Sequence, residues 1–510
     1  MSTFHGLEMA KQALFAQRSA LHTTGHKISN ANTEGYTRQR VNFETMSPYP
    51  AGARNRPEIP GQLGTGVQAG SIERIRDQFL DNQFRAENGK SGYWETLSSA
   101  LGRMENIMNE PSESGLSHTM DQFWQSLQDL AVSPDNSGAR SVVAERGLAV
   151  SETFNYLADS LTTIRSDLKN QIDVTVADAN SLMRQIHGVN EQIKQLEPHG
   201  YLPNDLYDER DRLIDDLSNM MNIKVTYEKS GESSPDIAKG LASIEVINNQ
   251  GHSFDPPVTL VNGAPGQGAV NEIEIAYGGE TGSLDAVESI SAGGVNLDIL
   301  DTNGSLGGLI EAYGHSIGEN DNVTGIYTTM LANLDDMANA FAEAFNEVHQ
   351  NGRNLDNEPG EQFFVFKEGL TGARGLTVNQ DILDYPEKIA ASADGTQGNG
   401  ANATELAAVF NNTNLEGDPL GENTSVNSFY QSIIGELGVA AQEANRMTNN
   451  TEILRSQVEN QRMSVSSVSL DEEMSNMIKF QHAYNASARS MTAMDELLDR
   501  IINNMGLAGR

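Results

Sequence analysis

The sequence predicts a mainly α-helical protein with an inserted β-rich domain, and two patterns support this prediction. Apolar residues recur in heptads at both ends of the 510-residue chain and again in its middle, as they do in long helices that pack side by side. Between residues 222 and 300 they instead recur at every second position, as in half-buried strands. We therefore expect a shaft of long helices with a small β domain set into it.

The C-terminus predicts one helix with a continuous apolar seam. Its members recur every seven residues or lie three residues after one that does: Leu470, Met477, Phe480, Tyr484, Met491, Met494, Leu498, Ile501 and Met505. Ser469 is the expected N-cap, and the acids at 471–473 suit the positive end of the helix dipole. Because a single helix cannot bury its own stripe, this seam requires a partner.

The N-terminus carries a second seam, formed by Leu7, Leu14, Leu21 and Ile28. Ala10, Ala13 and Ala20 lie beside this series and permit a close helix approach. Residues 1–40 have five bases and two acids (+3), whereas residues 466–510 have four bases and six acids (−2). We expect the two ends to form a terminal coiled coil whose remaining faces meet neighbouring subunits. The heptads leave open whether the helices pair within one chain or between two.

The middle of the chain predicts the shaft and the insert. A third heptad series predicts a helix over residues 141–197, ended by Pro198 and Gly200. Further helices are expected at 93–108, 204–221 and 330–349, and strands at 223–227, 244–246, 273–277 and 376–378. Three domains follow from this pattern: a terminal coiled-coil domain (1–65 plus 466–510), a helical shaft (66–221 plus 301–465) and an inserted β-rich outer domain (222–300).

Composition excludes several classes of partner. The formal charge of −36 repels nucleic acid and anionic lipid headgroups, so we expect no nucleic-acid partner. We also expect no membrane insertion, because no stretch approaches 18 apolar residues. There is no cysteine, and the first residues lack the basic and apolar segments of a cleaved signal peptide.

The sequence predicts no catalytic residue, no cofactor and no metal site, and hence a protein that is not an enzyme. It contains no zinc-protease helix motif, no nucleophile elbow and no phosphate-binding loop. His22 and His26 stand four residues apart but lack a nearby third ligand, so we interpret them as polar-face residues.

The segment Ile28-Ser-Asn-Ala-Asn-Thr-Glu-Gly-Tyr36 ends the first predicted helix, and Gly35 supplies a turn before the chain extends. This segment resembles the N-terminal signature of bacterial flagellar rod, hook and hook-associated proteins. The motif residues are Asn30, Asn32, Thr33, Gly35, Tyr36 and Arg38. Arg38 followed by Gln39 indicates the hook-associated protein 1 family.

Three further segments, 204–214, 305–311 and 466–488, also resemble that family, although Ser467 and Ser469 replace its usual Gly and Asn. The resemblance implies a structural subunit of the extracellular flagellum at the hook–filament junction, exported without a cleaved signal peptide. The implied partners are copies of the same chain in a helical ring, the hook protein, a second junction protein, the flagellar type III export apparatus and an export chaperone on the C-terminal helix.

Two alternatives remain open at this stage. A hook or rod subunit shares residues 28–36 but is expected to lack the long 141–197 helix. An axial protein carrying an enzymatic insert would need clustered catalytic side chains in 222–300, where His252 is the one histidine and has no partner pattern.

Overall fold

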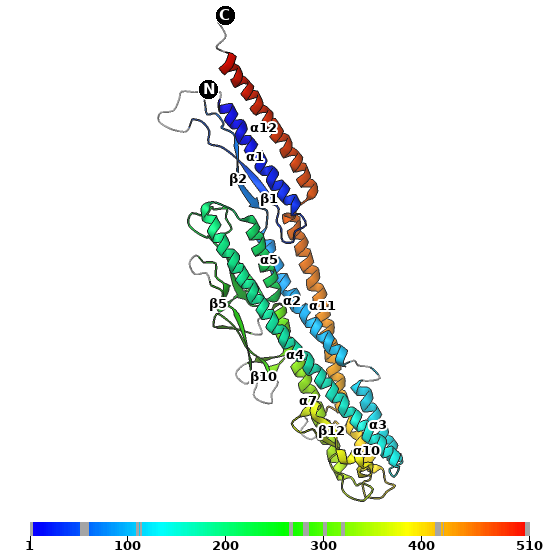
Figure 1. The fold of residues 1–510 in the computed structure, drawn as a ribbon. Helices are drawn as coiled ribbons and strands as arrows, with labels where there is room; N and C mark the ends of the chain where they lie inside the picture. Colours follow the sequence, from blue (N-terminus) through cyan, green and yellow to red (C-terminus); the bar gives the residue numbers. More distant parts are fainter. Residues whose placement is uncertain are drawn as a thin grey trace.

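The computed structural model describes residues 4–50, 61–108, 112, 115–264, 269–278, 285–298, 303–317, 322–413, 420–421 and 423–504. The molecule is an elongated rod (Figure 1). A pair of terminal helices forms one end, long helices form the shaft, strands lie along one side, and short helices form the other end.

The terminal end contains helices α1 (Phe4–Ser29) and α12 (Leu470–Asn504) and an antiparallel hairpin of β1 (Gln39–Thr45) and β2 (Val67–Arg74). The hairpin packs against α1. α12 follows α11 (Val426–Ser466) after a break of three residues, so the terminal pair continues the line of the shaft (Figure 1).

The shaft is built from α2 (Gln78–Met108), α4 (Ser137–Leu196), α5 (Asn204–Met220), α6 (Gly304–Tyr313), α7 (Ile326–Asn351) and α11. α11 lies along α2 and buries a heptad stripe whose side chains are smaller from Ala441 to the terminal end. Its buried members are Val426, Tyr430, Ile433, Leu437, Ala441, Ala444, Thr451 and Val458.

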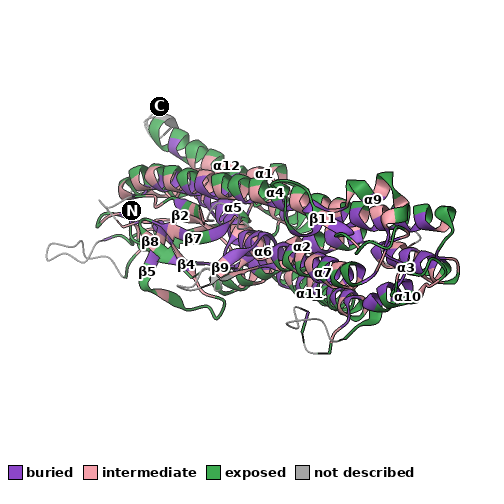
Figure 2. Cartoon of the chain, turned by 90° about the horizontal axis from the view of Figure 1, so that it is seen from below, coloured by how far each residue is buried: buried purple, intermediate pink, exposed green. Residues whose placement is uncertain are grey.

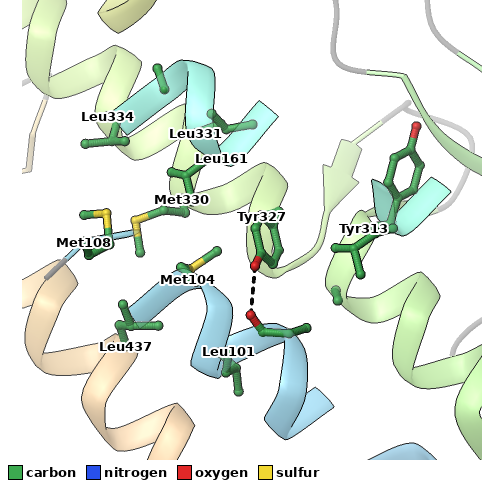
Figure 3. Packing of buried hydrophobic residues seen from close by; sticks show 14 of the residues in the cluster. Leu101, Met104, Met108, Leu161, Tyr313, Tyr327, Met330, Leu331, Leu334 and Leu437 are labelled. Carbon is green, nitrogen blue, oxygen red and sulfur yellow. Dashed lines mark hydrogen bonds between the residues drawn. The ribbon is translucent and has the colours of Figure 1, made fainter. Parts of the chain in front are cut away.

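The apolar core lies between these helices (Figure 2). Figure 3 shows Met104 of α2 next to Met330 of α7. Tyr327 is fully buried and donates its hydroxyl hydrogen to the carbonyl oxygen of Ala100 at 2.8 Å, which satisfies the polar end of the ring inside this core.

The strands on the side of the shaft form two sheets. One has the order β3-β4-β5: β3 (Ile223–Glu228), β4 (Leu241–Ile247) and β5 (Ser253–Val261). The other has the order β10-β9-β7-β6, with β8 paired to β7: β6 (Ile273–Gly278), β7 (Ala286–Ala292), β8 (Val295–Leu297), β9 (His315–Ile317) and β10 (Asn322–Thr324). Along the chain, α6 therefore lies between β8 and β9, which belong to the same sheet, and this connects the sheet to the shaft.

The end opposite the terminal pair contains α3 (Leu116–Val132), α8 (Gly372–Gly375), α9 (Gln380–Asp384), α10 (Ala401–Ala408) and a hairpin of β11 (Phe364–Phe366) and β12 (Leu376–Val378). Six phenylalanine rings pack together there, with centroids 4.9–6.5 Å apart in each contacting pair: Phe123, Phe341, Phe345, Phe363, Phe364 and Phe410. Aromatic packing of this density anchors the far end of the rod.

His349 makes the stability of this end depend on pH. Its Nδ1 lies 2.6 Å from the carbonyl oxygen of Glu361, and its Nε2 accepts the N–H of Ala390 at 2.9 Å, so the bound form is neutral. Burial lowers the pKa of His349 to about 4. The contribution of the neutral ring to the free energy of unfolding is therefore complete above the pKa of histidine in the unfolded chain, about 6.5. It is lost as the pH falls towards the pKa of His349 in the folded protein.

We expect the free energy of unfolding to fall by about 3 kcal/mol from this group alone between pH 7 and pH 4. Urea unfolding at a series of pH values measures this loss. His349→Gln removes the titrating group, so its pH profile should be flatter over that range. Equal slopes for the two proteins would contradict the assignment.

α2 crosses the end of α5 at Gly89 and Gly92. A Cβ atom placed on Gly92 would lie 2.3 Å from the backbone oxygen of Asn219, which is closer than atoms can approach. Gly92→Ala should therefore push the helices apart and cost about 1–3 kcal/mol of stability. Gly102 lies on the same helix with nothing within 4 Å of such an atom, so Gly102→Ala is the matched control. It should be neutral or stabilising by up to about 1 kcal/mol in thermal unfolding, because alanine favours helix.

The fold class expected from the sequence is confirmed: the chain is mainly helical with small antiparallel sheets. The helix expected at 141–197 is α4, Ser137–Leu196. The strands expected at 223–227, 244–246, 273–277 and 376–378 lie within β3, β4, β6 and β12. The structure adds the β1–β2 hairpin, the strands β5 and β7, and a first shaft helix that begins at Gln78.

Candidate functional site

The two terminal helices pair within one chain and run antiparallel. Gly6 of α1 faces Met494 of α12, where an added Cβ would lie 3.0 Å from Cε of Met494. At the other end of the pair, Lys27 Nζ lies 2.5 Å from Glu473 Oε2. The buried positions of α1 are small or polar: Ala10, Ala16, Ala20, Thr23, Thr24 and Lys27. Small side chains let the two backbones approach closely.

The predicted seam of α12 is only partly covered. Leu498 is buried, whereas Met477, Phe480, Tyr484, Met491 and Met494 are half-buried. Leu470 and Ile501 remain 46% and 40% exposed, and Met505 lies outside the described residues.

On α1, the predicted series Leu7, Leu14, Leu21 and Ile28 is half-buried and flanks the alanines. A single chain therefore leaves apolar surface on both helices, and the role of these seam residues in assembly stays a prediction.

The base of the pair is held by charged and polar contacts. Lys27 and Glu473 are both nearly buried, with side-chain exposures of 9% and 4%. The Arg38 N–H donates to the carbonyl oxygen of Ser466 at 2.8 Å, and the Arg38 guanidinium lies 3.5 Å from Glu472. These contacts fix the start of α12 against the segment that follows α1. Breaking a buried pair at one partner leaves an uncompensated charge, so this contact specifies how the helices align.

The motif residues form the loop that turns the chain at this base. Asn30 donates its side-chain N–H to the carbonyl oxygen of His26 at 3.0 Å and accepts the hydroxyl of Thr33 at 3.2 Å. Gly35 has φ of +77°, a left-handed conformation that favours glycine. Asn32 is exposed.

Tyr36 and Thr37 attach the loop to its surroundings. The Tyr36 hydroxyl lies 3.1 Å from Nδ1 of His26. Burial, reinforced by Asp208, Asp205 and Glu473, raises the pKa of Tyr36, so the hydroxyl keeps its proton. The Thr37 N–H donates to Asp208 on α5 at 3.1 Å. The motif therefore connects α1 to the shaft.

A buried cluster of arginine and aspartate side chains, which we call the joint cluster, lies where the terminal end meets the shaft. It consists of Arg74, Arg76, Asp81, Arg85, Asp208, Asp211, Asp215 and Arg462, drawn from the end of β2, the segment after it, α2, α5 and α11. Arg74 lies 2.6 Å from Asp208 and 2.9 Å from Asp211. Asp215 lies 2.7 Å from Arg85 and 2.5 Å from Arg462.

Asp211 lies at the centre of the joint cluster. Burial acts to raise its pKa, but Arg76, Arg74 and Arg85 outweigh burial and hold the pKa of Asp211 far below its usual value. At Asp208 burial prevails over Arg74 and Thr37, so the pKa of Asp208 is raised. The joint cluster thus holds at least one permanently ionised carboxylate among several guanidiniums, an arrangement that fixes five segments in one geometry.

A cleft of about 1200 Å³ opens beside the joint cluster, between the motif loop, α4, α5 and α11. Its lining mixes both signs of charge with amides and hydroxyls. Among the described residues, no group of three His, Asp or Glu side chains is arranged to hold a metal ion. A search of those residues also found no helix both long and apolar enough to cross a membrane.

Sequence reasoning missed the joint cluster and the Lys27–Glu473 pair. One signal for the cluster was present, because Asp208, Asp211 and Asp215 recur at spacings of three and four on one face of a predicted helix. Glu473 carries no such signal, because an acidic residue in the first turn of a helix is already accounted for by the helix dipole.

The comparisons with known proteins agree with this geometry. Residues 101–364 match the family described as the flagellar hook-associated protein FlgK helical domain, and residues 459–505 match the flagellar basal body rod FlgEFG protein C-terminal family. A solved structure, the flagellar hook junction protein FlgK from Burkholderia pseudomallei, superimposes with a TM-score of 0.56 at 14% identity. It covers 76% of this chain and 100% of its own, and at this identity it shows the fold alone.

Full-length relatives settle the family. Flagellar hook-associated protein 1 from Bacillus subtilis (strain 168) is 47% identical over 515 residues, covering 100% of both chains. The protein of the same name from Escherichia coli (strain K12) is 24% identical and covers 97% of this chain and 98% of its own. The chain therefore belongs to the flagellar hook-associated protein 1 family.

Proposed function

We propose that this chain is a structural subunit that joins the flagellar hook to the filament. The observation that carries this proposal is the 47% identity along the whole chain to a flagellar hook-associated protein 1. The geometry supports it, because the fold is a rod whose terminal helix pair leaves apolar side chains exposed for contact with other subunits. The chain acts by its shape and contacts, without catalysis, metal or cofactor.

Assembly couples ordering of the terminal helices to binding. The buried positions of α1 are small or polar and most of the α12 seam is only half-buried, so one chain leaves apolar surface of both helices uncovered. Exposed apolar residues on α12 include Leu470, Met474 and Ile478. Contact between copies in a helical ring would bury these residues and offset the entropy of ordering the helices.

The proposed partners are those that membership of the family implies. The terminal coiled-coil domain (1–65 plus 466–510) contacts its own copies, the hook protein below and the second junction protein above. The shaft (66–221 plus 301–465) and the outer β domain (222–300) lie outside the helical ring that the terminal domains form. An export chaperone covers the α12 seam before assembly, and the flagellar type III apparatus exports the chain.

A strain that lacks this chain tests the junction role. We expect electron micrographs of that strain to show hooks with no filament attached and filament subunits released into the medium. Supplying the full chain should restore filaments. Filaments of normal length on the hooks of the deletion strain would contradict the proposal.

A further inference from the structure

α1 carries a second stripe on the face that points away from α12. Its members follow heptad spacing: Phe4, Glu8, Lys11, Phe15, Arg18 and His22. Phe4 is 61% exposed and Phe15 is 48% exposed. Two cations flank the ring of Phe15, with Lys11 Nζ 6.0 Å and Arg18 Cζ 5.4 Å from its centroid. The outward face of α1 is thus aromatic and basic, in a chain whose formal charge is −36.

α12 carries an uncovered ridge of the opposite character. Met474 is 58% exposed and Ile478 is 53% exposed, and Asp471 lies on the same side of the helix one turn before Met474. At 100° per residue, this ridge lies beside the seam that faces α1, not on it. The α12 ridge is therefore aliphatic and acidic.

One chain cannot join these two surfaces to each other. Its α1 already contacts its own α12 through Gly6 and Lys27, which lie on the other side of α1 from Phe15. Every copy therefore carries both an exposed face around Phe15, flanked by Lys11 and Arg18, and an exposed ridge formed by Asp471, Met474 and Ile478. Two surfaces of complementary charge and shape on one molecule make a head-to-tail contact between copies, which closes into a ring or continues as a helix.

We propose that the outward face of α1 in one copy docks on the α12 ridge of the next copy, with Phe15 packed against Met474 and Ile478. In an antiparallel pairing, a register that places Phe15 beside Ile478 puts Arg18 beside Met474 and His22 beside Asp471. This register differs by about seven residues, or about 10 Å of axial rise, from the register within one chain. The inference rests on the proposed function, because it describes neighbouring copies in the assembled flagellum.

Because the chain has no cysteine, engineered cysteines report this contact without background. We would co-express Phe15→Cys chains and Ile478→Cys chains in a strain that lacks the native chain, purify flagella and oxidise them. The two positions are on different chains, so a disulfide between them requires neighbouring copies. His22→Cys with Asp471→Cys is a second pair predicted by the same register, in case one substitution interferes with folding. Phe15→Cys with Val439→Cys is the control, since Val439 is 66% exposed but lies on α11 in the shaft.

We expect an oxidant-dependent dimer from both proposed pairs and none from the control. A chain that carries both Phe15→Cys and Ile478→Cys should give a ladder of higher multimers. Monomer alone, from flagella that contain the chain, would overturn the docking proposal and leave the junction role intact. Absence of the chain from flagella that are otherwise complete would overturn both.

Discussion

Deletion of residues 470–510 is expected to abolish assembly and to leave the shaft and the β sheets folded. The deletion removes α12, so Glu473 no longer pairs with Lys27 and the small-residue face of α1 is uncovered. The joint cluster survives, because Arg462 is on α11 and the other members lie between residues 74 and 215. Circular dichroism should show a thermal transition close to that of the full chain, and purified flagella should contain none of the truncated protein.

Deletion of 505–510 alone provides the control. It leaves the whole of α12, Leu470–Asn504, and should assemble. An assembled flagellum built from the 470–510 deletion would refute the assembly role of α12. Loss of the thermal transition would instead show that the shaft depends on the terminal pair.

Asp211→Ala is expected to cause a large loss of stability, because it removes the central carboxylate of the joint cluster. That carboxylate lies 2.9 Å from Arg74, 3.6 Å from Arg76 and 3.7 Å from Arg85, all of which are nearly buried. Its removal leaves these guanidiniums without their central partner, which should cost about 3–5 kcal/mol. Urea unfolding at pH 7 measures the loss.

The matched control is Asp216→Ala on the same helix. Asp216 pairs with Arg212 at 3.1 Å, but its side chain is 49% exposed, so the loss should stay below about 1 kcal/mol. Similar losses for the two variants would contradict the account of the joint cluster.

The pH dependence of the joint cluster separates its two inner carboxylates. Because the folded pKa of Asp211 is depressed, its stabilisation is complete above its unfolded pKa and is lost as the pH falls below about 4. The raised pKa of Asp208 has the opposite effect on the pH dependence of stability. Burial penalises its ionised form, and protonation at lower pH relieves that penalty. Asp211→Ala should therefore flatten the loss of stability in acid.

The terminal helices and α4 could be predicted from the sequence because their signal is local and repeated, whereas α11 (Val426–Ser466) was not among the expected helices. Over α4 the heptad series runs for most of 60 residues, and Pro198 and Gly200 mark its end. The β1–β2 hairpin could not be predicted in this way. β1 alternates Val41 and Phe43 with polar residues over only a few positions, and its partner strand begins more than twenty residues later.

The candidate site was predicted in part. Heptads located both terminal helices, but the fully buried apolar positions of α1 are Ala10, Ala16 and Ala20, whereas its leucine series is only half-buried. The joint cluster brings together side chains from residues 74 to 462, and such long-range pairs of charges leave no periodic trace in one sequence. Lys27 and Glu473 are also far apart in the sequence and meet only in the folded chain, so no local pattern predicts their contact.

Gold labelling of isolated flagella tests the junction role most directly. A small tag inserted after Gln250 would lie in the exposed turn between β4 and β5, away from the terminal helices. We expect electron microscopy to show one narrow band of label between hook and filament. Label along the whole hook, or an absence of label from flagella, would contradict the proposal.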